Sequence, residues 1–471
     1  MILSIDLGTS KLCAVALDSA TGLPTAIRSR PNDTNIAGLP DDMHEQDPVR
    51  TVELALGLMK HALADESAAG QPVEAIGISG QMHGVLLVDR ELRPLTNLVT
   101  WRDRRTAREN TPGSISEALA AVSQEYEAIT GCRLAVGYGA ATLRWLDANR
   151  LLPPDCIALS IAGYLAARLT GVVAVDETHA ASWGILDVAK NHWHEESITR
   201  LNLRRDALPP IKPSGAPLGR LTAPIADGLG ISGEAVVCSP VGDAQSSVIG
   251  SVGFASDTIV INLGTGGQIS IPRAEPVYTC ELDAWPMPFG GYLQLGATLC
   301  GGWSYAYLKD FFKAVVAEIG GVDLSDEVIY ERMVALAAFA APGAGGLIAD
   351  TRFSGTRKNK DITGSVLGIG TANLTPANLS LAVIEGIVDD LHSMLLSSGA
   401  PTARTLLASG NAVRRNPVLR SAIRRAFEME CRTPTVPEEA ARGAGYAAAV
   451  GAGVLTRDQV TDITRRLVDS L

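Results

Sequence analysis

The sequence lacks the features that mark several large classes of protein. Its seven cysteines are scattered between positions 13 and 431 without a Cys-x-x-Cys pair, which favours reduced thiols in the core of a cytoplasmic protein. There is no run of eighteen apolar residues, so no membrane span is predicted. The first residues lack the basic and apolar regions of a secretory signal. We therefore expect a cytoplasmic protein without a membrane partner.

Positive charge is also in short supply. The chain has 40 Lys and Arg against 51 Asp and Glu, which gives a net charge of −11, so a generic nucleic-acid surface is not expected. A local phosphate site stays open, because a few backbone N–H groups and one metal ion can hold a nucleotide on an acidic protein. The Walker A motif is absent, which disfavours a P-loop kinase. The set of protein-kinase motifs is absent as well.

What the sequence does have is length and a regular order of elements. A chain of 471 residues, 46% of them hydrophobic, predicts two to four domains. Short apolar segments separated by turns predict strands at 2–7, 11–17 and 25–29. A helix with proline at its start is predicted at 48–64, and a buried strand at 73–79. Three antiparallel strands followed by alternating helices and strands indicate an α/β fold with a mixed sheet.

One short pattern occurs twice. IDLGTSK (5–11) and INLGTGG (261–267) both fit a strand, a Gly-Thr turn and a second strand, and they lie about half the chain apart. Such self-similarity predicts an internal duplication. We therefore expect two domains, 1–232 and 233–471, with the boundary near 228–233.

The Gly-Thr turns suit phosphate. Glycine lets backbone N–H groups approach phosphate oxygens, and hydroxyl groups add donors. Asp6, beside the first turn, could hold a hydrated Mg²⁺, since hard cations favour carboxylate and water. One copy alone also fits an ordinary hairpin turn, but two copies predict a phosphate clamp between two domains. A third small-residue turn, Gly410-Asn411, follows a strand at 405–407 and suits either a nucleotide or an ordinary βα loop.

Asp243 opens a predicted helical stretch at 244–252. This position suits two roles, the N-cap of the helix or a general base. As a base, Asp243 would take the proton from a sugar hydroxyl that attacks the γ-phosphorus. Phosphoryl transfer requires little besides one base, a metal ion and well-placed donors.

Polar and aromatic side chains follow the strands of the first half. Gln81 and His83 lie between two predicted strands, and Trp101 and Asp103 follow a third. Loops after strand ends hold ligands in open α/β sheets. Polar groups beside an aromatic ring suit a polyol, because its hydroxyls require donors and acceptors while its C–H face stacks on the ring. For His83, a histidine satisfied within the core is the alternative.

These motifs, in this order, resemble one known family. They are IDLGTSK (5–11), HEQDP (44–48), ISGQMHG (78–84), TWRDRR (100–105), VGDAQSS (241–247), NLGTGGQ (262–268) and ASGNAVRRNP (408–417). They are similar to motifs of the FGGY carbohydrate kinases over essentially the whole chain. The resemblance implies two actin-like ATPase (ribonuclease H-like) domains around a central cleft, the first binding the sugar and the second binding ATP. It also implies an enzyme that phosphorylates a sugar with ATP and Mg²⁺.

The resemblance assigns roles to individual residues. Asp243 is expected to be the catalytic base, and Asp6 and Asp243 are expected to hold the metal ion. Substrate contacts are expected from Gln81, Met82, His83, Trp101 and Asp103. ATP contacts are expected from Thr9, Ser10, Lys11, Gly264, Thr265, Gly267, Gly302, Gly410 and Asn411.

The expected substrate is a ketose. Some stretches resemble the family members that act on sedoheptulose, a seven-carbon ketose, and favour phosphate transfer to its terminal primary hydroxyl. These stretches are 98–106, 129–146, 176–187, 298–308 and 415–427. Xylulose or another pentulose is the alternative. The chain departs from the usual family pattern at Ala244, Arg104 and Thr356, which bears on the choice of sugar more than on the reaction.

Two other classes of function stay open. One is a weakly catalytic sugar-binding sensor on the same fold, and the other is an actin- or chaperone-like ATPase. Retention of Asp6, Asp243 and both Gly-Thr turns speaks against a sensor. The sugar-type motifs at 79–84 and 100–103 speak against a pure ATPase. The sequence leaves the oligomeric state open, and a homodimer is compatible with it.

Overall fold

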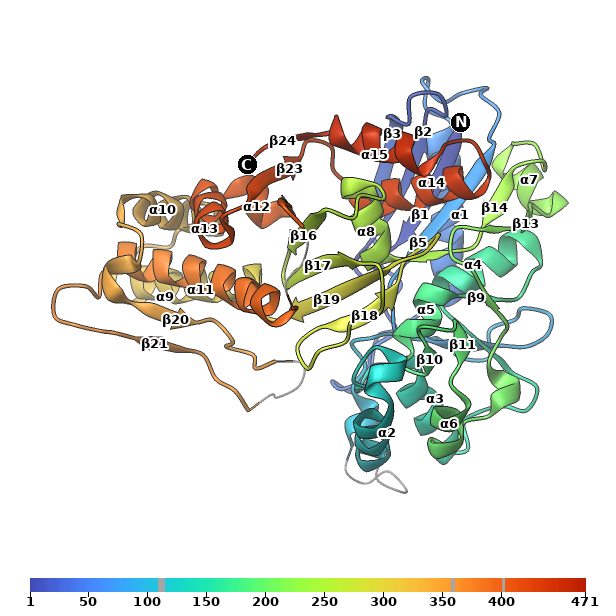
Figure 1. Ribbon diagram of the computed structural model, residues 1–471, viewed down its shortest axis with the longest axis horizontal. Helices are drawn as coiled ribbons and strands as arrows, with labels where there is room; N and C mark the ends of the chain where they lie inside the picture. Colours follow the sequence, from blue (N-terminus) through green and yellow to red (C-terminus); the bar gives the residue numbers. More distant parts are fainter. Residues whose placement is uncertain (109–114, 357–360, 400–402) are drawn as a thin grey trace.

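Two seven-stranded sheets form the framework of the protein (Figure 1). The structure is a computed structural model that describes residues 1–108, 115–356, 361–399 and 403–471. The first sheet contains β1 (Ile2–Leu7), β2 (Lys11–Leu17), β3 (Pro24–Pro31), β5 (Ala75–Gly80), β13 (Pro217–Arg220), β14 (Val236–Cys238) and β15 (Val241–Gly242). The second contains β16 (Thr258–Leu263), β17 (Gly267–Arg273), β18 (Asp283–Pro286), β19 (Tyr292–Thr298), β22 (Thr405–Ser409), β23 (Glu430–Pro434) and β24 (Val468–Ser470).

The two sheets repeat one arrangement of strands. In the first sheet β1 pairs antiparallel with β2 and parallel with β5. In the second, β16 pairs antiparallel with β17 and parallel with β22. Each Gly-Thr turn therefore joins the first two strands of its own sheet. This confirms the predicted mixed α/β fold, and it places the two copies of the sequence pattern at equivalent positions.

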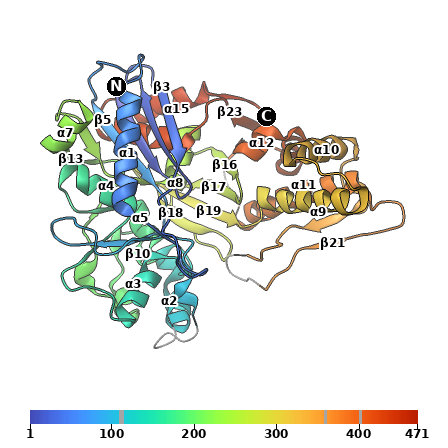
Figure 2. The ribbon, with the colours of Figure 1, turned by 180° about the vertical axis from the view of Figure 1, so that it is seen from behind.

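Helices and small two-stranded sheets surround this framework (Figures 1 and 2). The helices of the first half are α1 (Pro48–Leu63), α2 (Ile115–Thr130), α3 (Gly139–Ala148), α4 (Ile161–Thr170), α5 (Glu177–Ser182), α6 (Glu195–Arg200) and α7 (Ala223–Leu229). Those that follow are α8 (Asp243–Val252), α9 (Gly302–Gly320), α10 (Asp326–Phe339), α11 (Pro376–Ser397), α12 (Asn411–Arg415), α13 (Pro417–Phe427), α14 (Glu439–Gly451) and α15 (Arg457–Arg465). The small sheets pair β4 (Glu45–Gln46) with β7 (Leu98–Val99), β6 (Leu86–Val88) with β8 (Ile157–Leu159), β9 (Val175–Asp176) with β12 (Ile211–Lys212), β10 (Leu186–Asp187) with β11 (His192–Trp193), and β20 (Ile348–Asp350) with β21 (Ser365–Leu367).

The helix predicted at 48–64 shows how local chemistry sets an element. It runs from Pro48 to Leu63, and Asp47 caps its start by accepting hydrogen bonds from the backbone N–H groups of Val49 at 2.9 Å and Arg50 at 3.0 Å. Proline suits the first helical position because the N–H that it lacks would have no partner there. The predicted helix start is confirmed, and its end lies one residue earlier than expected.

The first sheet is buried on both faces. Side chains of a strand alternate between the faces, so Leu3 and Ile5 of β1 pack into the cluster that includes α1, while Ile2 packs into the cluster formed with α14. Figure 2 shows α1 lying over β3. Apolar residues on both faces explain why the sequence of β1 reads as a nearly continuous apolar run.

Helix α14 comes from the end of the chain but packs on the first sheet. It lies on β5 and crosses α8 at very short range. A Cβ atom built on Gly443 of α14 would lie 1.8 Å from the carbonyl oxygen of Ser246, and one on Gly250 of α8 would lie 1.8 Å from that of Glu439. Glycine at these positions allows the two helix backbones to approach each other closely.

The strands also bear on the predicted domains. Strands β14 and β15 follow residue 232 in the chain, yet both pair with β5 in the first sheet. Together with α14, they connect residues of the second half to the first sheet. The division into 1–232 and 233–471 stays a prediction.

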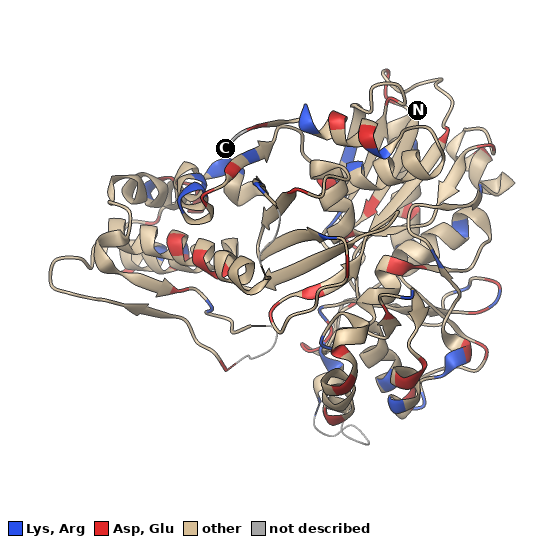
Figure 3. Cartoon of the chain, in the orientation of Figure 1, with Lys and Arg blue, Asp and Glu red and all other residues tan. Residues whose placement is uncertain are grey.

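Charged residues of both signs lie on both halves of the molecule (Figure 3). Among the described residues, no helix combines the length and the apolar character that crossing a bilayer requires.

The crossing of α8 and α14 predicts a large difference between two Gly→Ala substitutions. Gly443→Ala should lower the free energy of unfolding by about 2 kcal/mol or more, because the added methyl overlaps a backbone carbonyl. Gly57→Ala should raise it by roughly 0.5–1 kcal/mol, since Gly57 is exposed within α1 and a Cβ there meets nothing within 4 Å. Urea unfolding of both variants measures this. Equal effects of the two substitutions would contradict the close crossing.

Candidate active site

Three strand ends meet at one edge of the first sheet. In the parallel pairing, Asp6 of β1 lies opposite Ser79 of β5, and Gly80 lies opposite Gly242 of β15. Asp243 follows at once as the first residue of α8, and its Oδ1 accepts a hydrogen bond from the N–H of Ala244 at 2.8 Å. The sheet therefore brings Asp6 and Asp243, 237 positions apart in the sequence, to the same edge.

The carboxylate of Asp6 is in an unfavourable place for a negative charge. Its Oδ1 atom is shielded from solvent and has no hydrogen-bond partner among the residues that the structure describes. Burial raises the pKa of Asp6 to about 7, and the negative charge of Asp243 adds to this rise. A divalent cation between the two carboxylates would satisfy the open oxygen and offset the repulsion, so the pair fits Mg²⁺. Among the described residues no cluster of three acidic, His or Cys side chains could hold a metal, so phosphate and water would complete its coordination.

Thr9, a predicted ATP-binding residue, is hydrogen-bonded to two of the predicted sugar-binding residues, Gln81 and Trp101. Its hydroxyl donates a hydrogen bond to Oε1 of Gln81 at 2.9 Å and accepts one from the indole N–H of Trp101 at 2.8 Å. Gln81 donates to Oε1 of Gln46 at 2.8 Å, and Gln46 donates to the carbonyl oxygen of Thr9 at 2.8 Å. The turn expected at the phosphates is thus bonded to residues expected at the sugar.

Gln81 and Trp101 differ in their access to a ligand. Gln81 is buried and its amide is bonded to Thr9 and Gln46, whereas 39% of Trp101 is exposed. The Trp101 ring also lies under the guanidinium group of Arg102, 5.3 Å from its carbon. Of these two predicted sugar ligands, Trp101 therefore offers the open surface.

The predicted nucleotide glycines lie together. The N–H of Gly302 donates to the carbonyl oxygen of Gly264 at 3.0 Å, and a Cβ on Gly302 would lie 2.5 Å from that oxygen. Gly410 has a φ of 101°, in the region that favours glycine, and a Cβ there would lie 2.2 Å from the carbonyl oxygen of Leu263. These three segments meet backbone to backbone, which leaves no room for larger side chains.

The other predicted nucleotide residues border the same segments. The carbonyl oxygen of Thr265 accepts a hydrogen bond from the N–H of Trp303 at 2.9 Å. Gly267 begins β17 directly after the turn, and Asn411 begins α12 directly after Gly410. The second half thus gathers all its predicted ATP residues at one place.

Two adjacent glutamates connect the first turn with the Gly410 segment. Glu438 accepts hydrogen bonds from Nζ of Lys11 at 2.7 Å, and Glu439 forms an ion pair with Arg414 of α12 at 3.3 Å. Ser10 is exposed beside Lys11. Because Glu438 and Glu439 are neighbours at the start of α14, this helix start connects the first turn with α12, which follows Gly410.

His83 is enclosed by side chains from both halves. Its ring stacks on Tyr138 with 4.3 Å between ring centroids, and it meets Trp285 of β18 edge-on at 5.9 Å. Its Nδ1 lies 2.7 Å from the carbonyl oxygen of Ser182, which can only accept, so this nitrogen carries a proton. His83 has a φ of 69°, a backbone conformation that residues other than glycine adopt infrequently and that the surrounding structure must hold.

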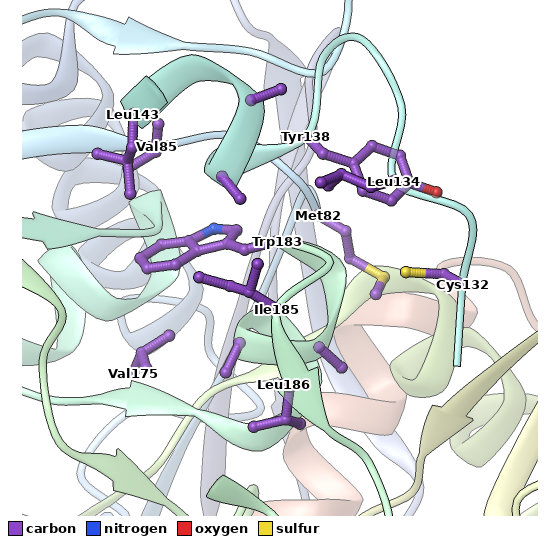
Figure 4. Packing of buried hydrophobic residues seen from close by; sticks show 14 of the residues in the cluster. Met82, Val85, Cys132, Leu134, Tyr138, Leu143, Val175, Trp183, Ile185 and Leu186 are labelled. Carbon is purple, nitrogen blue, oxygen red and sulfur yellow. The ribbon is translucent and has the colours of Figure 1, made fainter. Parts of the chain in front are cut away.

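Met82 and Ala244 are buried next to Asp243 or its neighbour Gly242. Met82 belongs to an apolar cluster with Tyr138 and Trp183, and Figure 4 shows its sulfur beside Cys132. A Cβ on Gly242 would lie 3.0 Å from the Met82 sulfur, so this side chain packs against the residue before Asp243. Ala244 is part of the same cluster.

Asp103 is fixed by its own neighbours. Nε of Arg105 donates to Oδ1 at 2.8 Å, Nη2 donates to Oδ2 at 2.7 Å, and the N–H of His44 donates to Oδ2 at 2.8 Å. Arg105 is buried and also bonds to Glu45. Sequence reasoning did not single out Arg105, although TWRDRR contains it. The neighbouring Arg104 is exposed.

Sequence reasoning also missed the polar residues beneath the site. Asp176, Thr178 and His179 are wholly buried on and beside α5. The Thr178 hydroxyl accepts a hydrogen bond from the N–H of Gly242 at 2.7 Å, and Nε2 of His179 lies 3.2 Å from the carbonyl oxygen of Gly80. The available signal was the segment DETHAAS (176–182), a group of polar residues within an otherwise apolar stretch.

Several known proteins are similar to this chain over most of its length. The FGGY family of carbohydrate kinases, N-terminal domain, matches residues 1–250. The chain is 28% identical to the sedoheptulokinase of Mus musculus, over 90% of this chain and 92% of that protein. It is 26% identical to the xylulose kinase of Lactococcus lactis, over 99% and 90%. The xylulose kinase structure from Rhodospirillum rubrum superposes with a TM-score of 0.87 at 22% identity, over 100% and 93% of the two chains.

A second solved structure extends the comparison. The structure of Plasmodium falciparum glycerol kinase with ADP superposes with a TM-score of 0.82 at 20% identity, over 100% of this chain and 93% of that chain. The chain belongs to the FGGY family of carbohydrate kinases. It has the actin-like fold of that family, and it is an ATP-dependent sugar kinase.

Glu177 of α5 predicts a pH dependence of stability. Burial raises its pKa to about 7, and the charge of Asp176 adds to the rise, against an ordinary value of 4.5. Between pH 4.5 and pH 7 the folded protein therefore binds more protons at Glu177 than the unfolded chain does, so Glu177 lowers the free energy of unfolding as the pH rises through this range. The amide of the Glu177→Gln variant does not titrate. Its free energy of unfolding, relative to that of the wild type, should therefore increase by up to about 3 kcal/mol across this pH range.

Urea unfolding at about pH 5 and about pH 8 measures this difference, and other titrating groups cancel in the comparison. Glu66→Gln, at an exposed position, is the matched control and should show no such change. A constant difference between Glu177→Gln and wild type at both pH values would mean that Glu177 titrates normally.

Proposed function

We propose that this kinase transfers the γ-phosphate of ATP to the terminal primary hydroxyl of a ketose, with Asp243 as general base and sedoheptulose as substrate. The observation that carries the catalytic part is the position of Asp243, at the first turn of α8 and at the same sheet edge as Asp6. A base must lie within reach of the proton that it takes. A carboxylate at a strand edge, next to the predicted phosphate turns, meets that requirement.

Each group of residues then has a distinct task. Asp243 would accept the proton of the attacking hydroxyl, while Trp101, His83 and the fixed carboxylate of Asp103 would orient the sugar. Asp6 and Asp243 would hold Mg²⁺, which supplies the positive charge that phosphoryl transfer requires. The two Gly-Thr turns and the Gly302 and Gly410 segments would bind the nucleotide. These contacts would come from Thr9, Ser10, Lys11, Gly264, Thr265, Gly267, Gly302, Gly410 and Asn411.

The choice of sedoheptulose rests on two supports. Sedoheptulokinases of Mus musculus and Homo sapiens are among the relatives, each 28% identical, and xylulose kinases follow at 25–30%. Ala244 follows Asp243, at a position where many members of the family carry an amide, and its small side chain could leave room for a longer polyol or a bridging water. A pentulose such as xylulose is the second candidate, supported by the xylulose kinases among the relatives.

The role of Asp243 is tested by Asp243→Ala. Loss of a general base should lower kcat by ~10² to 10⁴, while ATP binding is retained because the nucleotide contacts come mainly from other residues. A coupled ADP assay measures turnover and calorimetry measures nucleotide binding. Asp227→Ala, at an exposed aspartate of α7, is the matched control and should keep full activity. An Asp243→Ala enzyme within a few-fold of wild type would exclude the base role.

The substrate is tested by comparing three ketoses in the same assay. A site built for sedoheptulose should prefer it over D-xylulose and D-ribulose by roughly tenfold or more in kcat/KM, because hydroxyl partners left unpaired by a shorter sugar lower affinity. Glycerol and L-ribulose serve as controls. A higher kcat/KM for either pentulose would make the heptulose assignment wrong and leave the kinase assignment intact.

A further inference from the structure

We infer that α5 positions both the base and the sugar-binding histidine, through the hydroxyls of Thr178 and Ser182. This inference rests on the function proposed above, because it concerns the roles assigned there to Asp243 and His83. The helix has only six residues, Glu177 to Ser182. It nevertheless forms hydrogen bonds with the segments that carry both residues.

Thr178 holds the residue that precedes the base. Its Oγ1 accepts a hydrogen bond from the N–H of Gly242 at 2.7 Å, and its hydroxyl proton is donated to Oδ1 of Asp176. Because the hydroxyl both accepts and donates a hydrogen bond, its position is determined by α5. Gly242 has no side chain of its own to anchor it, so this bond fixes the backbone from which Asp243 projects.

Asp176 lies at the centre of these hydrogen bonds and is wholly buried. Its Oδ1 accepts hydrogen bonds from the N–H groups of Thr178 at 3.0 Å and His179 at 3.1 Å, and from the hydroxyl of Ser214 at 3.1 Å. Its Oδ2 lies 2.6 Å from Nδ1 of His179. A buried carboxylate with this many donors is held in one orientation.

His179 completes a buried ion pair. Its Nδ1 faces the Asp176 carboxylate and its Nε2 faces the carbonyl oxygen of Gly80 at 3.2 Å, and both partners can only accept. Both ring nitrogens therefore carry protons, and the ring is an imidazolium. Burial lowers the pKa of His179, but the charge and hydrogen bond of Asp176, together with smaller contributions from Asp243 and the carbonyl group of Gly80, raise it above its ordinary value. The Nε2–H bond ties α5 to Gly80, at the end of β5.

Ser182 holds His83. Its hydroxyl accepts a hydrogen bond from the N–H of His83 at 2.9 Å and donates one to the carbonyl oxygen of His179 at 2.7 Å. The carbonyl oxygen of Ser182 accepts from Nδ1 of the His83 ring at 2.7 Å. Backbone and ring are thus held together, which explains how His83 keeps its φ of 69° and its ring orientation.

The first test separates the two positioning bonds by kinetics. Thr178→Val removes the bond to Gly242 at nearly constant volume, and kcat should fall roughly ten- to hundredfold because a small misplacement of the base is costly. Ser182→Ala should raise the KM for the sugar roughly three- to tenfold, the effect of one lost hydrogen bond, with a smaller change in kcat. The KM for ATP should stay the same in both variants.

The controls distinguish positioning from general stability. Thr178→Ser keeps the hydroxyl and should restore most of kcat, and Thr199→Val makes the same substitution at an exposed position of α6. Melting temperatures are measured for all variants. If Thr178→Val and Ser182→Ala change kcat and KM together, in proportion to lost stability, the positioning role is wrong.

The second test needs no turnover. In wild-type protein labelled with ¹⁵N-histidine, both ring nitrogens of His179 should give protonated signals near neutral pH, and Asp176→Asn should abolish them. A neutral imidazole at His179 in the wild type would overturn the ion pair and with it the inference. If the wild type phosphorylates no ketose, the proposed function fails, and this spectrum still decides whether the ion pair exists.

Discussion

The structure depends on one constraint, the meeting of two carboxylates at the edge of the first sheet. Asp6 is the penultimate residue of β1 and Asp243 begins α8, and the parallel pairing of β1, β5 and β15 brings their strand ends level. Like charges held close together in a partly buried place repel each other, which contributes to the raised pKa of Asp6. Such repulsion persists only where the surrounding structure holds both groups, and the rest of the fold does so.

Two parts of the fold supply that support. On one side, α14 lies against β5 and crosses α8 at glycine contacts, so the helix that carries Asp243 is pressed onto the first sheet. On the other side, α5 binds Gly242 and Gly80 through Thr178 and His179. Both parts act on backbone rather than on the carboxylates themselves.

The ligand turns are linked across the molecule. Thr9 forms hydrogen bonds with Gln81 and Trp101. Lys11 forms an ion pair with Glu438, and the adjacent Glu439 forms one with Arg414. Residues expected at the sugar, at the first phosphate turn and near the Gly410 segment therefore belong to one bonded set.

The sequence by itself determined the local features. Short apolar segments and turn chemistry located the strands β1 and β2, the Asp47-Pro48 helix start and the two equivalent Gly-Thr turns, because these depend on neighbours in the chain. Motif order predicted the family. Tertiary structure decided the long-range partners: Trp101 with Thr9, 92 residues apart, and Lys11 with Glu438, 427 apart. It alone placed His179 between the Asp176 carboxylate and the carbonyl oxygen of Gly80, two acceptors that only packing brings to the ring.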